Sequence, residues 1–139
     1  DREKIIFHLY RNLRFNTLKM WGEFLIGMKF EEEYKFVWSA LSYDKFLEYG
    51  RPLQSHEGAA SMFAGVVKGA DFGIIMLEKQ KGKLYVSFRS RMDFDVSKIA
   101  LALGGGGHRA AAGVIIQGLS FTEAVEKVLQ TARKLAKEK

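Results

Sequence analysis

The sequence contains 139 residues, a length that fits one domain with a hydrophobic core. Its residues are 47% hydrophobic and 27% charged, which is ordinary for a globular protein and excludes a low-complexity chain. Cysteine is absent, which excludes disulfides and thiol chemistry, and the formal net charge of +6 favours an anionic partner such as a phosphate-bearing ligand.

The sequence shows neither a signal peptide nor an apolar run of about 18 residues, so we expect a cytoplasmic protein with no membrane partner. Because the chain begins at Asp1 rather than Met, we expect a processed or truncated piece of something longer. Apolar residues recur at helical spacing in residues 2–13 and again from about residue 16 or 17 to residue 28. The three acidic residues at 31–33 then predict a solvated connector.

A strand, a helical turn and a helix are predicted next along the chain. Residues 34–43 carry apolar side chains on both faces, which favours a central strand. Residues 44–49 predict a short helix capped by Asp44 and ended by the Gly-Arg-Pro sequence that follows. Residues 56–68 predict a narrow helix rich in Gly and Ala, with His56 and Glu57 as solvated residues of its first turn.

A hairpin is predicted over residues 72–91, with a polar turn at residues 78–82. Side chains alternate between the two faces of its second strand. One face carries Leu84, Val86 and Phe88, and the other carries Tyr85, Ser87, Arg89 and Arg91. The two arginines are expected to converge on one phosphate group, since a guanidinium binds phosphate through two hydrogen bonds. The alternative is a solvent-facing basic edge.

The last part of the chain predicts one short and one long helix. Asp95 or Ser97 caps a helix that runs through residue 103, and residues 114–117 predict a strand. Ser120 and Glu123 form the capping box of a final amphipathic helix, the clearest periodic signal in the sequence. Together these elements predict an α/β (α+β) fold, a central mixed β-sheet of about four to five strands flanked by helices, with an N-terminal helical linker.

Four consecutive glycines at residues 104–107 are followed by His108, Arg109, three alanines and Gly113. A backbone without β-carbons lets a ligand approach the main-chain N–H groups, and the adjacent basic pair suits an anion. The alternative is a flexible linker, although such linkers are usually padded with Ser or other polar residues. The run is not a P-loop, and Arg109 stands where a dinucleotide-binding fingerprint has its third glycine.

Residues 105–113, Gly-Gly-Gly-His-Arg-Ala-Ala-Ala-Gly, resemble the Gly-Gly-Gly-His-x-x-Ala-Ala-Gly signature of the DHH-associated C-terminal domain of DHH-family phosphoesterases. A second element resembles the branch of nano-RNases, phosphoadenosine phosphate phosphatases and diadenylate phosphodiesterases. It consists of Ser87-Phe88-Arg89-Ser90-Arg91 followed by Asp95-Val96. The resemblance covers roughly residues 34 to 136, with the two motifs in register.

The resemblance implies that residues 1–28 are a helical linker and the remnant of a catalytic-domain helix, and that residues 29–139 are the substrate-binding domain. It also implies that the intact enzyme hydrolyses short oligoribonucleotides, cyclic or linear dinucleotides, or phosphoadenosine phosphate. The substrate-binding residues that it implies are Arg89, Ser90, Arg91, Gly105, Gly106, Gly107, His108 and Arg109. Separated from its partner, the 1–28 segment would expose apolar surface, which favours self-association as a homodimer.

The sequence itself offers no catalytic or metal-binding residue. A metal hydrolase needs several ligands at suitable spacing, whereas His8, His56 and His108 stand alone and no Asp-His-His triplet occurs. No nucleophile motif occurs either. The resemblance places Mn²⁺ and the hydrolytic reaction in an N-terminal DHH catalytic domain, so this chain is expected to bind the substrate rather than to catalyse.

Two other functions stay open at this point. One is a non-catalytic RNA-binding module, because a domain of this type also follows alanyl-tRNA synthetase, where it contacts tRNA. The synthetase version, however, lacks the His-Arg-Ala-Ala-Ala continuation. The other is a chain that dimerises or swaps through residues 1–28 and binds no ligand well.

Overall fold

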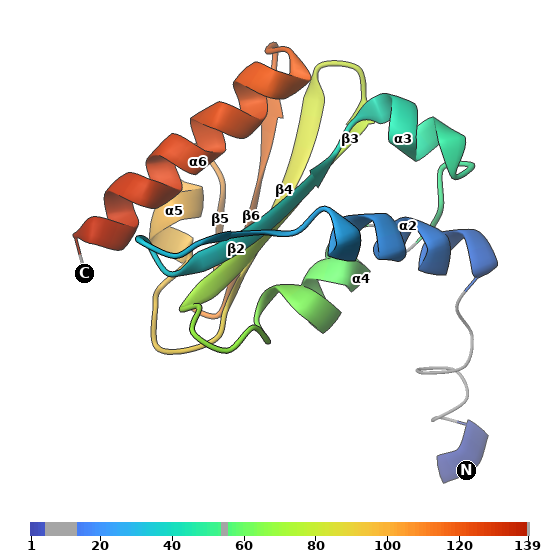
Figure 1. The fold of residues 1–139 in the computed structure, drawn as a ribbon, viewed down its shortest axis with the longest axis horizontal. Coiled ribbons are helices and arrows are strands. Elements are labelled where there is room, and N and C mark those ends of the chain that lie inside the picture. Colours follow the sequence, from blue (N-terminus) through green and yellow to red (C-terminus); the bar gives the residue numbers. More distant parts are fainter. Residues whose placement is uncertain (5–13, 54–55, 139) are drawn as a thin grey trace.

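One mixed sheet organises the chain. The computed structural model describes residues 1–4, 14–53 and 56–138. Six strands in these residues follow the order β1-β2-β3-β4-β6-β5 (Figure 1). Their bounds are Lys29–Glu31 (β1), Phe36–Leu41 (β2), Phe72–Gln80 (β3), Lys83–Ser90 (β4), Gly106–Gly107 (β5) and Ala111–Gln117 (β6). The predicted α/β class is confirmed, and the short edge strands β1 and β5 account for the excess over the four to five expected.

Among the described strands, only the β2–β3 pair is parallel, because the long connection between these two strands carries helices across one face of the sheet. The other four strand pairs are antiparallel. The predicted hairpin is confirmed as β3 and β4, which pair along nearly their whole length. The helical segment expected at residues 2–13 lies mostly outside the described residues, and the division proposed at residue 28 stays a prediction.

Helices cover both faces of the sheet (Figure 1). The helices on one face are α5 (Ser97–Ala102) and α6 (Phe121–Lys137), and those on the other are α2 (Phe15–Ile26), α3 (Tyr43–Glu48), α4 (His56–Ala59) and the π-helix η1 (Ala60–Ala64). Each face has its own buried core, since the sheet lies between them. No described helix is long and apolar enough to cross a membrane.

The final helix is the element that the sequence specifies most fully. Ser120 Oγ accepts a hydrogen bond from the Glu123 N–H, and the Glu123 carboxylate accepts one from the Ser120 N–H, both at 3.2 Å. This capping box satisfies two N–H groups that the helix start would otherwise leave unpaired. The predicted buried stripe of α6 is confirmed, and it packs on the alternating apolar residues of β4 and β6.

Two glycines let η1 press directly against the sheet. A β-carbon added at Gly73 on β3 would lie 1.9 Å from the Ala64 carbonyl oxygen, and one at Gly65 would lie 3.0 Å from the Ser90 carbonyl oxygen. The predicted helix over residues 56–68 is therefore close-packed, but it is shorter and different in kind. It ends at Ala64, and its second half is a π-helix, a form that often marks functional sites.

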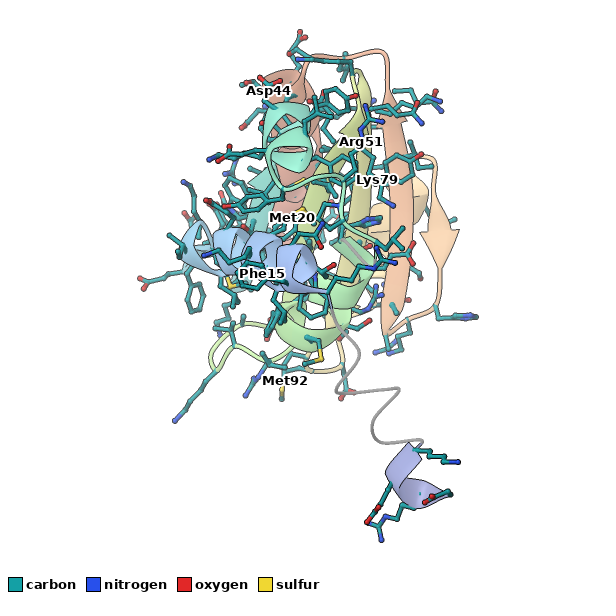
Figure 2. All side chains as sticks on the ribbon, turned by 90° about the vertical axis from the view of Figure 1, so that its right-hand side faces the viewer. Phe15, Met20, Asp44, Arg51, Lys79 and Met92 are labelled. Atoms are coloured by element: carbon teal, nitrogen blue, oxygen red, sulfur yellow. The ribbon has the colours of Figure 1, made fainter. Side chains whose placement is uncertain are left out.

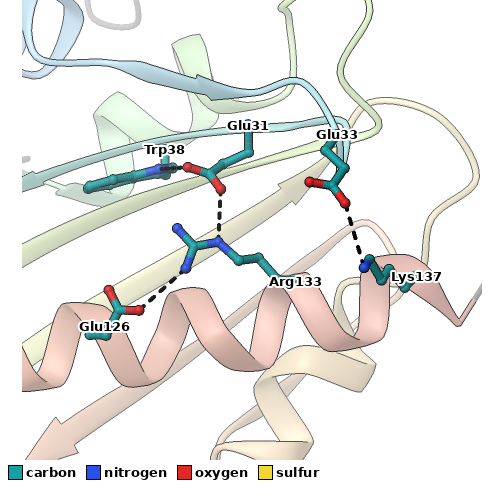
Figure 3. Close-up of polar contacts among 6 residues, drawn as sticks. All are labelled: Glu31, Glu33, Trp38, Glu126, Arg133 and Lys137. Carbon is teal, nitrogen blue, oxygen red and sulfur yellow. Dashed lines mark hydrogen bonds and ion pairs between the residues drawn. The ribbon is translucent and has the colours of Figure 1, made fainter.

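The acidic segment at residues 31–33 is not simply a solvated connector. Glu31 ends strand β1, and its carboxylate accepts hydrogen bonds from Arg133 Nε on α6 at 2.8 Å and from Trp38 Nε1 at 3.3 Å (Figure 3). Arg133 lowers the pKa of Glu31. The correction has a physical reason: Glu31 faces a helix from the other end of the chain, which local sequence does not reveal.

Two further predictions are corrected at the start and end of helices and strands. Ser42, rather than Asp44, caps α3 by accepting a hydrogen bond from the Lys45 N–H. Glu78 lies within strand β3 rather than in a turn, and it is buried. Its carboxylate accepts hydrogen bonds from the Tyr43 and Gly82 N–H groups, which satisfy it in the buried position. Both corrections concern polar side chains whose partners are backbone groups.

Candidate functional site

Arg89 on β4, Ala111 on β6 and His108, which directly follows β5, lie in one row. The register pairs Arg89 on β4 with Ala111 on β6. Ala111 and His108 in turn exchange backbone hydrogen bonds, with N···O distances of 2.8 and 3.2 Å. Residues directly opposite each other in an antiparallel pair present their side chains to the same face. Arg89 and His108 therefore stand on either side of Ala111, on the same face of the sheet.

The next row of the same face has almost no side chains. Gly113 on β6 pairs with Ser87 on one side and with Gly106 on the other. A β-carbon added at Gly106 would meet nothing within 4 Å. Helix α4 and η1 pack mainly against β3 and β4, so this surface of β6 and β5 is left largely uncovered. We call it the open sheet surface, made up of Arg89, Gly106, His108, Ala111 and Gly113; Ser87, at its inner border, is buried.

Gly105 and Gly107 of the predicted ligand loop are required by packing against β6. A β-carbon at Gly105 would lie 2.2 Å from the Gly113 carbonyl oxygen, and one at Gly107 would lie 2.5 Å from the Ala112 Cα. Gly107 also has a φ of 144°, which residues with side chains rarely adopt. The glycine run is thus a strand pressed against β6. Gly106 is left without a packing reason, and a bare residue on an open surface favours close approach of a ligand.

The main-chain donors of the glycine run are not equivalent. The Gly105 N–H is already used, because it donates to the Ala100 carbonyl at 2.7 Å. His108 and Ala111 form a hydrogen-bonded pair, so the next pair along the ladder, Gly107 and Ala112, is a non-hydrogen-bonded pair. The N–H group of Gly107 therefore points outward, away from β6. Strand β5 is the sheet edge, so the Gly107 N–H is the donor best placed for a ligand.

The Arg89 guanidinium keeps most of its hydrogen-bonding capacity. Nη1 donates to the Phe88 carbonyl at 3.0 Å, and Nη2 donates to Ser61 Oγ on η1 at 3.4 Å. Burial lowers the pKa of Arg89, and the Glu57 carboxylate acts in the opposite direction. No carboxylate within the described ranges forms an ion pair with it. A half-buried guanidinium without a carboxylate partner suits an anionic ligand.

The remaining predicted site residues lie elsewhere. Ser90 alternates to the opposite face from Arg89, and its Oγ donates to the Met92 carbonyl at 2.6 Å. Arg91 follows the end of β4, and its Nη1 reaches the Ala70 carbonyl at 3.5 Å. Arg109 donates to the Asp93 carbonyl. The structure therefore brings Arg89 and His108 together on the open sheet surface, and it places Ser90, Arg91 and Arg109 around the backbone that follows β4.

Arg109 borders a different cavity. This cavity, of about 560 Å³, lies between the segment after β4 and the end of α6, with Asp93, Asp95 and Lys98 in its lining. Its acidic side chains make it a poor site for a phosphate. Within residues 1–4, 14–53 and 56–138, no group of three or more His, Cys, Asp or Glu residues could hold a metal ion. We therefore assign no metal site to these residues.

Sequence reasoning missed the contribution of α4 and η1. Ser61 contacts the Arg89 guanidinium, and the Glu57 carboxylate is close enough to act on its pKa. His56, expected to be solvated, is only 3% exposed. Burial first, and then the charges of Lys79 and Arg89, lower its pKa to about 4. The only signal available beforehand was the strand alternation that placed Tyr85, whose ring lies 5.7 Å from that of His56, on the same face as Arg89.

Comparison with proteins of known structure supports the fold. An exopolyphosphatase-related protein from Bacteroides fragilis is similar, with a TM-score of 0.75 at 21% identity over 99% of this chain and 41% of that one. The pGpG-specific phosphodiesterase PggH from Vibrio cholerae is similar with a TM-score of 0.56 at 13% identity, over 97% of this chain and 42% of that one.

Sequence comparison shows the family. The chain is 38% identical over 73 residues to the bifunctional oligoribonuclease and PAP phosphatase NrnA of Thermus thermophilus, an alignment that covers 51% of this chain and 22% of that protein. The chain thus spans less than half the length of each of these relatives. The model of the DHHA1 domain matches residues 50–138, which include both the Arg89 strand and the glycine run. The chain belongs to the DHHA1 domain family.

Proposed function

We propose that this chain is the substrate-binding domain of a phosphoesterase, and that the open sheet surface binds a phosphate group of a short oligonucleotide, a dinucleotide or phosphoadenosine phosphate. The observation that carries the proposal is the row of Arg89, Ala111 and His108 beside the bare backbone of Gly106 and Gly113. The name of the Thermus relative, an oligoribonuclease and PAP phosphatase, supports this class of ligand.

Each group has a chemical role in this proposal. The Arg89 guanidinium offers paired donors at the geometry of two phosphate oxygens. His108 is exposed, so its imidazole is free to donate to the phosphate from the other end of the row. The outward N–H of Gly107 adds a main-chain donor. Arg91 and Arg109 would have to leave the backbone carbonyls that they contact before joining the same phosphate.

The reaction is assigned to a second domain. In the proposal, a DHH catalytic domain holds Mn²⁺ and carries out hydrolysis, and the present domain orients the nucleotide so that the scissile phosphate reaches that centre. The described residues supply no cluster of metal ligands to this chemistry. Exposed apolar side chains on α2, including Phe15 and Ile26, support contact of this helix with another domain or chain (Figure 2).

Calorimetric titration of AMP, phosphoadenosine phosphate and a linear diadenylate into the 139-residue chain tests the proposal. Charge-assisted hydrogen bonds contribute roughly 1.5–3 kcal/mol each, so Arg89→Ala and His108→Ala should each lower affinity by about one to two decades. Lys83→Ala is the matched control, because Lys83 starts the same strand on the same face, six residues away from Arg89. Equal effects of Lys83→Ala and Arg89→Ala would contradict the site.

The salt dependence of binding separates this proposal from an RNA-binding module. A pocket for one or two phosphates releases few counterions, so the logarithm of the affinity should fall with a shallow slope against the logarithm of salt concentration. An RNA-binding module that covers many phosphates should show a steep slope and should prefer long RNA to a diadenylate. A steep slope with no measurable affinity for the three small ligands would replace the proposal with that alternative.

A further inference from the structure

A second cavity lies on the same side of the sheet as Arg89, at the N-terminal end of α4. It has a volume of about 280 Å³, and its polar lining consists of Arg51, His56, Glu57 and Lys79. Arg51 comes from the segment after α3, and Lys79 comes from the end of β3. Figure 2 labels both residues, and their side chains lie close together in the upper part of that view. Small-molecule sites usually have volumes of roughly 300–1,000 Å³, so this cavity suits a single small group.

His56 borders the cavity with an unpartnered nitrogen. Its side chain is buried, and Nδ1 makes no hydrogen bond. Nε2 lies 3.9 Å from the Glu57 carboxylate, too far for a hydrogen bond. A buried polar atom without a partner costs free energy, and such atoms are rare in folded proteins. A ligand atom that reached Nδ1 would remove this cost.

The charges around the cavity favour an anion. Arg51 and Lys79 are cationic, Glu57 is the only carboxylate in the lining, and the His56 imidazole is neutral at pH 7. Arg51 is already held by a hydrogen bond from its Nη2 to the Tyr43 hydroxyl at 2.8 Å, so its guanidinium is partly oriented. The Lys79 Nζ atom lies 5.0 Å from the centre of the Tyr85 ring, which is on β4, the strand that also carries Arg89.

We propose that this cavity binds a second phosphate group, which is held by Arg51 and Lys79 and accepts a hydrogen bond from His56 Nδ1. The assignment of that phosphate to a nucleotide chain rests on the proposed function. A ligand with a single phosphate, such as AMP, cannot occupy both Arg89 and the cavity. The second site would therefore favour oligonucleotides, which carry several phosphates, over AMP.

Nuclear magnetic resonance of the histidine side chains tests the cavity with inorganic phosphate. Phosphate is titrated into the ¹⁵N-labelled 139-residue chain at constant ionic strength, and His56→Gln assigns the His56 signals. We expect saturable shifts of the His56 nitrogens. Arg51→Ala and Lys79→Ala should each weaken phosphate about tenfold, whereas Lys81→Ala, a nearby exposed lysine outside the lining, should leave the affinity unchanged. Unmoved His56 signals, or equal effects of Lys79→Ala and Lys81→Ala, would overturn the proposal.

Titration with AMP and with oligoadenylates of two to five nucleotides identifies the source of the phosphate. Lys79→Ala should weaken the longer oligoadenylates about tenfold and leave AMP unchanged. If it weakens neither, the cavity holds free phosphate and the nucleotide assignment is wrong. The His108 signals report on the proposed function separately. Shifts at His108 without shifts at His56 would sink this inference alone, and the reverse pattern would sink the proposed function alone.

Discussion

Glu31 and Arg133 are separated by 102 positions in the chain, yet the carboxylate Oε1 and the guanidinium Nε lie 2.8 Å apart (Figure 3). The pair joins the edge strand β1 to α6, and both side chains are less than one-third exposed. We expect Arg133→Met to lower the free energy of unfolding by about 1–2 kcal/mol, because it leaves Glu31 with only the Trp38 donor.

The neighbouring pair of Lys137 and Glu33 provides the control for that measurement. Its atoms are 3.6 Å apart and both side chains are more than 60% exposed, so Lys137→Met should change stability by less than about 0.5 kcal/mol. Urea unfolding of the three proteins gives the comparison. A loss in Lys137→Met as large as that in Arg133→Met would show that burial of the Glu31 pair adds nothing.

The glycine run should separate into structural and functional positions. Gly107→Ala should destabilise the fold by about 2–3 kcal/mol, because its β-carbon meets Ala112 and its φ of 144° is strained for alanine. Gly106→Ala should keep or slightly raise stability, since its β-carbon meets nothing. The same methyl group would occupy the open sheet surface and lower nucleotide affinity by about tenfold. Unchanged nucleotide affinity in a folded Gly106→Ala protein would argue against a ligand at this glycine.

Stability should depend on the protonation of His56 at mildly acidic pH. Burial of the imidazole, and then the charges of Lys79 and Arg89, lower the His56 pKa to about 4 in the folded protein from near 6.5 when unfolded. Between these values only the unfolded state takes up the proton. Stability is therefore complete above pH 6.5 and falls on the order of 3 kcal/mol as the pH drops to about 4.

Thermal unfolding from pH 7 to pH 4 measures this dependence. His56→Gln removes the titrating group, so the loss of stability across the window should become much smaller, whatever its stability at pH 7. His108→Gln is the control, because His108 is exposed and its substitution should leave the slope unchanged. Parallel pH profiles for the parent chain and His56→Gln would show that His56 is not responsible.

Helix α2 should promote association of the isolated chain. Phe15 and Ile26 are 78% and 86% exposed on this helix, while Met20 and Phe24 on its other side are buried. Light scattering should give an apparent mass that rises with protein concentration, and Phe15→Glu with Ile26→Glu should abolish the rise. Leu101→Glu, at an exposed leucine on α5, should not. A monomer at all concentrations in the parent chain would contradict the prediction.

Sequence patterns predicted the elements whose partners are close in the chain. The β3–β4 hairpin, the Ser120 capping box and the buried stripe of α6 follow from local periodicity and turn residues. Two long-range contacts were not predictable in this way: Arg133 lies 102 positions from Glu31, and Tyr43 lies 35 positions from Glu78. Edge strands of two or three residues, such as β1 and β5, are too short to show a period.

The candidate site was predicted in part for the same reason. Strand alternation placed Arg89 on the correct face, and the glycine run marked the strand that carries His108. Ser61 and His56 were missed because η1 and α4 meet β4 only through the parallel crossover between β2 and β3. Arg109 was grouped with His108 because they are adjacent in sequence, yet a tight turn separates their contacts.

The β-sheet fixes the separation of Arg89 and His108. Two strand spacings of about 4.8 Å set their backbones roughly 10 Å apart, and ladder hydrogen bonds hold that width. In the proposed function, this fixed width selects a bound group that can reach both side chains. A slip of β5 by one residue against β6 would turn His108 to the opposite face. The fixed spacing would then be lost although no residue had been substituted.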